Sequence, residues 1–261
     1  MKALRDAMRY EAGRVWRDKA KAASHGLFLN EETITETLLL QLVMAGRGHG
    51  FAVYPFTKAE ETKIGADWEF WFTGGPAPIG LRVQAKRLFP SGKYDSLKPG
   101  GKQISDLIAR AAPCIPVLVF YNDMTKFTFG SPDCGCSEYR GESYRGCIVA
   151  SASKVQKEKS KDPSVLRHFA MPLHCLLCDD KVGKSALLAG LVSKNARRLS
   201  GLTENTEDEE EGHRLLNDRI QGLAARAADV VVPPPPWVEQ HFLERKLAGL
   251  AVFSDSDAAS P

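Results

Sequence analysis

Residues 66–87 read ADWEFWFTGGPAPIGLRVQAKR and decide the fold. Two runs rich in aromatic and β-branched residues flank the turn TGGPAP, which predicts a β-hairpin of strands 66–72 and 79–87. Side chains alternate between the two faces of a strand, and one face of each strand is polar: Asp67 and Glu69 in the first, Arg82, Gln84 and Lys86 in the second. Pairing the strands therefore gathers an acid, an amide and a lysine on one side. A face turned to solvent would show the same alternation, so the pattern leaves both interpretations open.

The segments around this hairpin predict an α/β core. Asn30 is placed to cap a helix over 31–45, with Glu31 and Glu32 in its first turn, where the helix dipole favours acids. Residues 115–121, IPVLVFY, are typical of a strand buried on both faces. The remaining expected elements are helices over 2–22, 102–112, 185–198 and 212–228 and strands over 51–56 and 173–177. The order helix, three strands, helix, strand over 31–121 predicts a mixed sheet with helices on its faces.

Composition excludes several classes of protein. The chain has 261 residues, 43% hydrophobic and 26% charged, with a net charge of +3, the balance of a globular protein in water. No apolar run is long enough for a membrane span, and the charged N-terminal stretch MKALRDAMRYEAGR does not resemble a secretory signal. These features predict a cytoplasmic protein without a membrane partner. The net charge is compatible with nucleic-acid binding but does not establish it.

Asp67 is followed, after sixteen intervening residues, by Gln84-Ala85-Lys86. This spacing resembles the PD-(D/E)XK restriction-endonuclease-like nucleases, and most closely their Mrr-type branch, which has QxK in place of (D/E)xK. Members carry a glutamate on the helix before the sheet, a position that Glu36 matches, and a glutamine on the first turn of the next helix, here Gln103. The resemblance covers about residues 30–122. Two departures are an alanine before Asp67 and the amide of Gln84, which removes one negative charge but keeps a carbonyl oxygen.

The resemblance implies a restriction-endonuclease-like mixed sheet and a Mg²⁺- or Mn²⁺-dependent endonuclease acting on nucleic acid, with DNA as the expected substrate. Such nucleases serve restriction and anti-phage defence, and a homodimer is compatible with the family. The catalytic residues it implies are Glu36, Asp67, Gln84 and Lys86, of which Glu36, Asp67 and Gln84 would hold the metal. The nucleic-acid-binding residues would be Arg87, Lys93, Lys98, Lys102 and Gln103.

The chain is expected to divide into four parts. These are a basic N-terminal helix (1–25), a nuclease-like α/β core (26–182) with a cysteine-containing insertion at 123–150, a helical C-terminal extension with an acidic run (183–232), and a proline spacer with a tail (233–261). The final residues, SDSDAASP, have the composition of a disordered segment.

Simpler interpretations remain for each site residue. Glu36 could close a capping box with Thr33, Asp67 and Lys86 could face solvent, and Glu69 is expected as a surface charge. Two other functions also remain open. One is a catalytically silent nucleic-acid-binding module of the same fold. The other is a protein-interaction module that uses the PPPPW segment at 233–237 and the acidic run.

The cysteines suggest a second metal site. Cys134, Cys136, Cys175 and Cys178 are the expected ligands of a structural zinc ion, and Cys147 and His174 are further candidates. Cys175 and Cys178 have the C-x-x-C spacing of many zinc sites. In the alternative, Cys175 lies in a buried strand and acts as a small hydrophobe.

Overall fold

The structure is a computed structural model that describes residues 2–45, 52–55, 67–73, 77–124, 142–178, 188–201, 211–226, 235–245, 247 and 249–253. Four sequence-based expectations lie outside the described residues. They concern the hairpin turn at 74–76, the cysteine pair Cys134 and Cys136, most of the acidic run, and the final tail.

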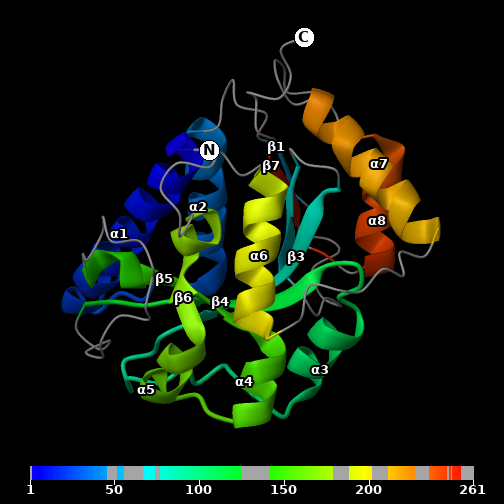
Figure 1. The fold of residues 1–261 in the computed structure, drawn as a ribbon. Helices are drawn as coiled ribbons and strands as arrows, with labels where there is room; N and C mark the ends of the chain where they lie inside the picture. The colour runs from blue at the N-terminus through cyan, green and yellow to red at the C-terminus, as the bar shows by residue number, and fades with distance from the viewer. Residues whose placement is uncertain are drawn as a thin grey trace.

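A seven-stranded mixed sheet forms the centre of the molecule (Figure 1). Its strands lie in the order β1-β7-β2-β3-β4-β5-β6. Their bounds are Ala52–Pro55 (β1), Trp68–Phe72 (β2), Ile79–Arg87 (β3), Ile115–Tyr121 (β4), Cys147–Ser151 (β5), Ala170–Pro172 (β6) and Gly249–Phe253 (β7). The expected hairpin is confirmed, because β2 and β3 pair antiparallel, and β4 then runs parallel to β3.

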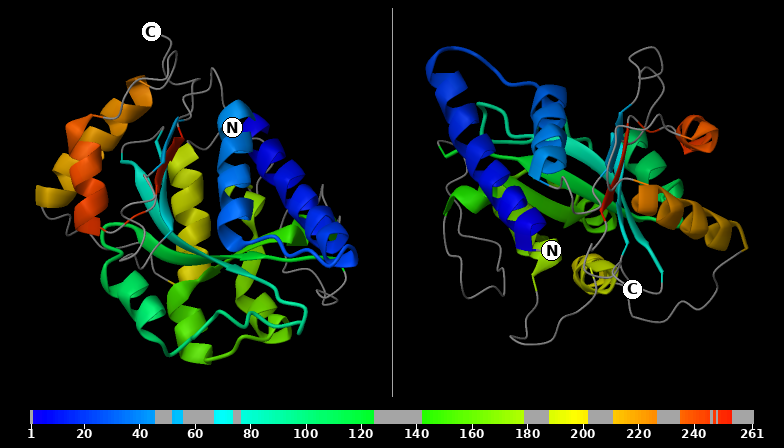
Figure 2. Two further views of the ribbon diagram at one scale, coloured as in Figure 1. Left: turned by 180° about the vertical axis from the view of Figure 1, so that it is seen from behind. Right: turned by 90° about the horizontal axis from the view of Figure 1, so that it is seen from above.

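Helices pack against both faces of this sheet (Figure 2). One face is covered by α1 (Lys2–Ser24), α2 (Glu31–Ala45) and α6 (Leu188–Ser200). The other is covered by α3 (Lys102–Ala109), α4 (Ala152–Glu158), α7 (Glu211–Arg226) and α8 (Pro236–Arg245). A short helix, α5 (Pro163–Leu166), and the 3₁₀ segments η2 (Glu142–Gly146), η3 (Arg167–Phe169) and η4 (Leu173–Leu177) complete the described elements. None of the described helices has both the length and the apolar character needed to cross a membrane.

The predicted secondary structure of residues 31–121 agrees with the structure. The order α2, β1, β2, β3, α3, β4 is the predicted helix, three strands, helix, strand. Strands β3 and β4 have the predicted bounds, and β4 is buried along nearly its whole length. The mixed α/β fold class is therefore confirmed.

The C-terminal segment departs from the expected division. Residues 233–261 were expected as a spacer and tail, but they contribute α8 and β7, and β7 lies between β1 and β2 inside the sheet. The core is thus not confined to residues 26–182. The run that forms β7 is only five residues long, and its partners lie far away in the sequence, so no local pattern identifies its place.

Residues 173–177 were expected to form a strand but form the 3₁₀ segment η4, and the strand β6 precedes them. All five side chains of η4 are buried. A short apolar run that is buried on every side has no periodicity that separates a strand from a helical turn.

The polar face of the hairpin is buried beneath α8. Glu69, expected at the surface, is fully buried and accepts hydrogen bonds from Trp71 Nε1 at 2.9 Å and from Arg82 at 3.2 Å. His241 of α8 places Nε2 3.2 Å from the same carboxylate. The charged pair on β2 and β3 is therefore part of the interior, which corrects the surface interpretation of Glu69.

Candidate functional site

The candidate site forms where β3 extends beyond β2. The last residue pair of the hairpin ladder is Trp68 with Val83, and Asp67 adds one bond from its backbone N to Val83 O at 2.9 Å. Strand β3 continues to Arg87 and stays paired with β4 on its other side. On the side of β2, the backbone N–H groups of Ala85 and Arg87 are thus left for acceptors other than a strand.

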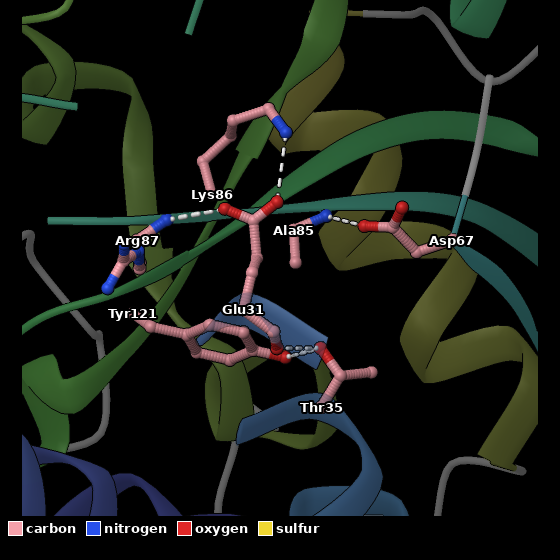
Figure 3. A network of polar contacts seen from close by, with 7 residues as sticks. All are labelled: Glu31, Thr35, Asp67, Ala85, Lys86, Arg87 and Tyr121. Carbon is pink, nitrogen blue, oxygen red and sulfur yellow. Dashed lines mark hydrogen bonds and ion pairs between the residues drawn. The ribbon is translucent and has the colours of Figure 1, made fainter. Parts of the chain in front are cut away.

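Two carboxylates accept these backbone groups (Figure 3). Asp67 Oδ2 accepts from Ala85 N at 2.5 Å, and Glu31 Oε2 accepts from Arg87 N at 3.0 Å. Asp67 comes from the beginning of the hairpin and Glu31 from the first residue of α2. The open edge of β3 therefore brings an acid from the sheet and an acid from a helix to within two residues of each other along the strand.

Lys86 is the residue of β3 between Ala85 and Arg87, whose N–H groups bind the two carboxylates. Its Nζ donates to Glu31 Oε1 at 3.0 Å, and its side chain is buried, whereas the Glu31 side chain is 20% exposed. Glu31 thus binds a backbone N–H with one oxygen and the lysine ammonium with the other. This bidentate arrangement fixes the position of the ammonium group.

The protonation of Asp67 reflects this crowded environment. Its pKa is raised to about 6, first because burial disfavours the carboxylate and further because Glu31 and Glu32 add negative charge. Lys86 and the Ala85 N–H act in the opposite direction without reversing the shift. The ionised form of Asp67 is therefore unfavourable in the metal-free protein, and a bound cation would stabilise it.

A pair of hydroxyl groups anchors the first turn of α2 to the sheet. Thr35 Oγ1 lies 2.9 Å from Tyr121 Oη and also donates to Glu31 O at 2.9 Å. Burial raises the pKa of Tyr121 well above its ordinary value, so its phenol stays protonated. The contact joins the helix that carries Glu31 to β4, the neighbour of the strand that carries Lys86 (Figure 3).

The structure brings Asp67 and Lys86 together as predicted. One further step of the antiparallel register places Gln84 directly across from Asp67, and Gln84 is fully buried. The expected acid–amide–lysine group thus occupies neighbouring positions at the open edge.

Glu36, predicted as the helix glutamate of the site, is exposed to solvent. The stripe of α2 that faces the core is Ile34, Leu38 and Leu42, and Glu36 lies halfway between the first two on the opposite side of the helix. Its assignment to the site is therefore wrong. The capping box with Thr33 is also absent, because α2 begins at Glu31 and Ile34 N donates to Asn30 O.

The glutamate that α2 contributes to this group of residues is Glu31 and not Glu36. The sequence identified it only as a first-turn acid favoured by the helix dipole, which is correct but incomplete. Its distance from Lys86 in the chain, 55 residues, explains why spacing within the helix did not reveal the contact.

The predicted nucleic-acid-binding residues differ in their surroundings. Arg87 belongs to the site through its backbone, while its guanidinium donates to Leu29 O at 3.0 Å and lies 4.5 Å from the centre of the Phe89 ring. Lys93, Lys98, Lys102 and Gln103 are exposed, and Lys102 pairs with Asp106 on the same turn of α3.

A shallow pocket adjoins the site at Arg87. Lys19 of α1, Asp123 and the exposed side chains of Leu27 and Phe28 also line it. Lys19 Nζ donates to Leu88 O at 3.0 Å, and burial lowers its pKa. Sequence reasoning did not single out Lys19, because it is one of seven basic residues spread over positions 1–21.

Comparison with known proteins gives one result. A family model described as a family of unknown function (DUF6615) matches residues 4–259. No curated protein and no solved structure matches the chain.

Proposed function

We propose that this chain, which belongs to the DUF6615 family of unknown function, is a metal-dependent nuclease that hydrolyses phosphodiester bonds, with DNA as its expected substrate. The observation that carries the proposal is the meeting of Asp67, Glu31 and Lys86 at the open edge of β3. The QxK spacing on β3 and the order of the flanking elements support it through the resemblance to PD-(D/E)XK nucleases.

The donor groups at this edge fit a hard divalent cation. Asp67 uses Oδ2 for the Ala85 N–H, which leaves Oδ1 as a ligand, and Gln84 across the ladder offers a carbonyl oxygen. Oxygen donors of this kind suit Mg²⁺ and Mn²⁺. When bound, the ion would acidify a coordinated water and offset negative charge on the phosphate. The elevated pKa of Asp67 agrees with this role, because a cation would relieve the repulsion that Glu31 and Glu32 impose.

The chain's own residues would position and stabilise the reacting phosphate. Lys86, held through Nζ by Glu31 Oε1, keeps other N–H donors for a phosphate oxygen, where positive charge is most effective as negative charge develops. Glu31 acts through Lys86 and is a positioning residue. Arg87 and Lys19 beside the site would meet neighbouring phosphates, which makes binding dependent on salt concentration.

The test is incubation of the full chain with supercoiled plasmid in Mg²⁺, in Mn²⁺ and in EDTA. We expect nicking that requires the metal, and loss of nicking in Asp67→Asn and Lys86→Met, with both variants keeping the native circular dichroism spectrum. Gln84→Glu should tighten Mg²⁺ binding in calorimetry if Gln84 is a ligand. Salt-sensitive DNA binding without cleavage would overturn the nuclease proposal in favour of a silent binding module. Neither binding nor cleavage would favour a protein-interaction module.

A further inference from the structure

A second group of metal-binding side chains lies on η4, in the part of the core formed by α1 and α6. His174, Cys175 and Cys178 each offer one ligand atom, and these three atoms lie within 4.8 Å of one another. All three residues are buried. The tight turn that gathers them is closed by Cys178 N donating to Cys175 O at 3.3 Å. The candidate nuclease site uses none of these groups.

The separations match those of a tetrahedral zinc site. Zn–S and Zn–N bonds of about 2.3 and 2.0 Å at tetrahedral angles place a sulfur and a nitrogen about 3.5 Å apart. Cys175 Sγ lies 3.6 Å from His174 Nε2. The C-x-x-C spacing is one that structural zinc sites use repeatedly. Chemistry and distances therefore both suit zinc.

The imidazole of His174 gives an independent indication of a ligand. The side chain is 1% exposed, and its Nδ1 has no hydrogen-bond partner among the described residues. A polar nitrogen buried in this way is costly unless it is satisfied. The ring centres of Tyr144 and His174 lie 5.3 Å apart, with the two ring planes at 69° to each other. Coordination through Nδ1 would use the lone pair of this nitrogen, whereas coordination through Nε2, which lies 3.6 Å from Cys175 Sγ, would place the ring hydrogen on Nδ1.

The two sulfurs take part in disulfide bonds in this structure, so a metal can bind only after they are reduced. Each disulfide that opens takes two hydrogen atoms from two molecules of a small thiol, which join to each other as a disulfide. Zinc then replaces the protons of the thiols that it binds. Disulfide and zinc site are thus alternative states of the same sulfurs, selected by the reducing power of the surroundings.

We propose that His174, Cys175 and Cys178 bind a zinc ion in the reduced chain. Arg5 and Arg9 of α1 lie close enough to act on the charge of His174, and they would offset the negative charge of the Cys175 and Cys178 thiolates.

The experiment uses the full chain purified in a reductant without chelator, with zinc measured by mass spectrometry. We expect about one zinc per chain, and less than about a tenth of that in the double variant Cys175→Ser/Cys178→Ser. The control is Cys147→Ala, which removes a buried cysteine of β5 that is not in a disulfide and should keep the zinc.

Cobalt substitution keeps the test decisive if a variant fails to fold. Wild-type chain loaded with Co²⁺ should show a sulfur-to-cobalt charge-transfer band and the intense visible bands of tetrahedral cobalt. Reduced wild-type protein with less than about one zinc per ten chains, or cobalt without the sulfur band, would overturn the proposal. The result is independent of the nuclease site, since plasmid nicking and zinc content are measured separately.

Discussion

Lys86 and Glu31 form an ion pair of 3.0 Å between the end of β3 and the first turn of α2. The pair exists because β3 extends beyond its partner β2 and leaves the N–H of Arg87 to be satisfied by a side chain, which Glu31 supplies with its second oxygen. The same carboxylate therefore completes a strand edge and orients a lysine. Glu31 therefore has both a structural role and a positioning role, and suitable variants can test the two roles separately.

Glu31→Gln should separate them. The amide can still accept from the Arg87 N–H, but it removes the charge that holds the Lys86 ammonium. We expect plasmid nicking to fall by about 100-fold or more, with a small change in melting temperature. Glu36→Gln on the exposed side of the same helix is the matched control and should nick at the wild-type rate. Equal nicking rates for Glu31→Gln and Glu36→Gln would show that Glu31 does not contribute to cleavage.

The pKa of Asp67 predicts a specific pH dependence of stability in the metal-free protein. Because the native pKa is about 6 and the ordinary value 3.8, the native state binds the proton more tightly between these two pH values. The contribution of Asp67 to the free energy of unfolding therefore falls as pH rises through this window and stays low above it. Asp67→Asn should gain stability relative to wild type from about pH 4 to about pH 6, as measured by urea unfolding in EDTA. A difference that does not change with pH would contradict the raised pKa.

The same proton competes with the metal. Mg²⁺ affinity of the wild type should drop about tenfold for each pH unit below about 6 and level off above it, since one proton must leave Asp67 before the ion binds. Calorimetric titrations at a series of pH values measure this directly. A flat profile would indicate that Asp67 is not the ligand, even if nicking needs the metal.

The buried pair of Glu69 and Arg82 predicts a large loss of stability when one partner is removed. Both side chains are fully enclosed, and their charged groups lie 3.2 Å apart. Arg82→Met removes the positive charge while Glu69 stays buried, so the free energy of unfolding should fall by about 3–5 kcal/mol. Arg110→Met, at an exposed position at the end of α3, should change it by less than about 0.5 kcal/mol. Chemical denaturation of the two variants makes the comparison.

The elements that the sequence predicts well carry their own periodicity. The continuous apolar run of β4 marks a strand buried on both faces, the alternation of β3 marks a strand, and the acids Glu31 and Glu32 mark the start of α2. The structure has all three elements at the predicted positions. Asp67 and Lys86 follow from them, because the hairpin register brings the two strands into line. This part of the site depends on neighbours that are close in the sequence.

What the sequence did not reveal depends on distant partners. Glu69 is buried by His241, which lies 172 residues away, and no alternation within β2 distinguishes a solvent face from a face covered by a later helix. The choice of Glu36 over Glu31 failed for a related reason. On α2 the apolar residues are spread around the helix, with Leu40 and Met44 exposed, so the sequence does not mark which side faces the sheet.

Strand β7 is the largest difference from the sequence-based division, and truncation tests it. β7 pairs antiparallel with β1 and parallel with β2, so its removal opens two strand edges inside the sheet. The truncation also removes four buried apolar residues from the two core clusters, Leu250, Ala251, Val252 and Phe253. A chain ending at residue 245 should therefore lose cooperative unfolding and accumulate as aggregate, because unpaired interior edges invite association.

The matched control is a chain ending at residue 253, which keeps all seven strands and lacks only SDSDAASP, the segment with the composition of a disordered tail. It should melt within a few degrees of the full chain in circular dichroism. If the chain ending at 245 melted cooperatively at the same temperature as this control, β7 would not be an integral strand. That result would support the predicted boundary of the core at residue 182, because the sheet would then be stable without β7.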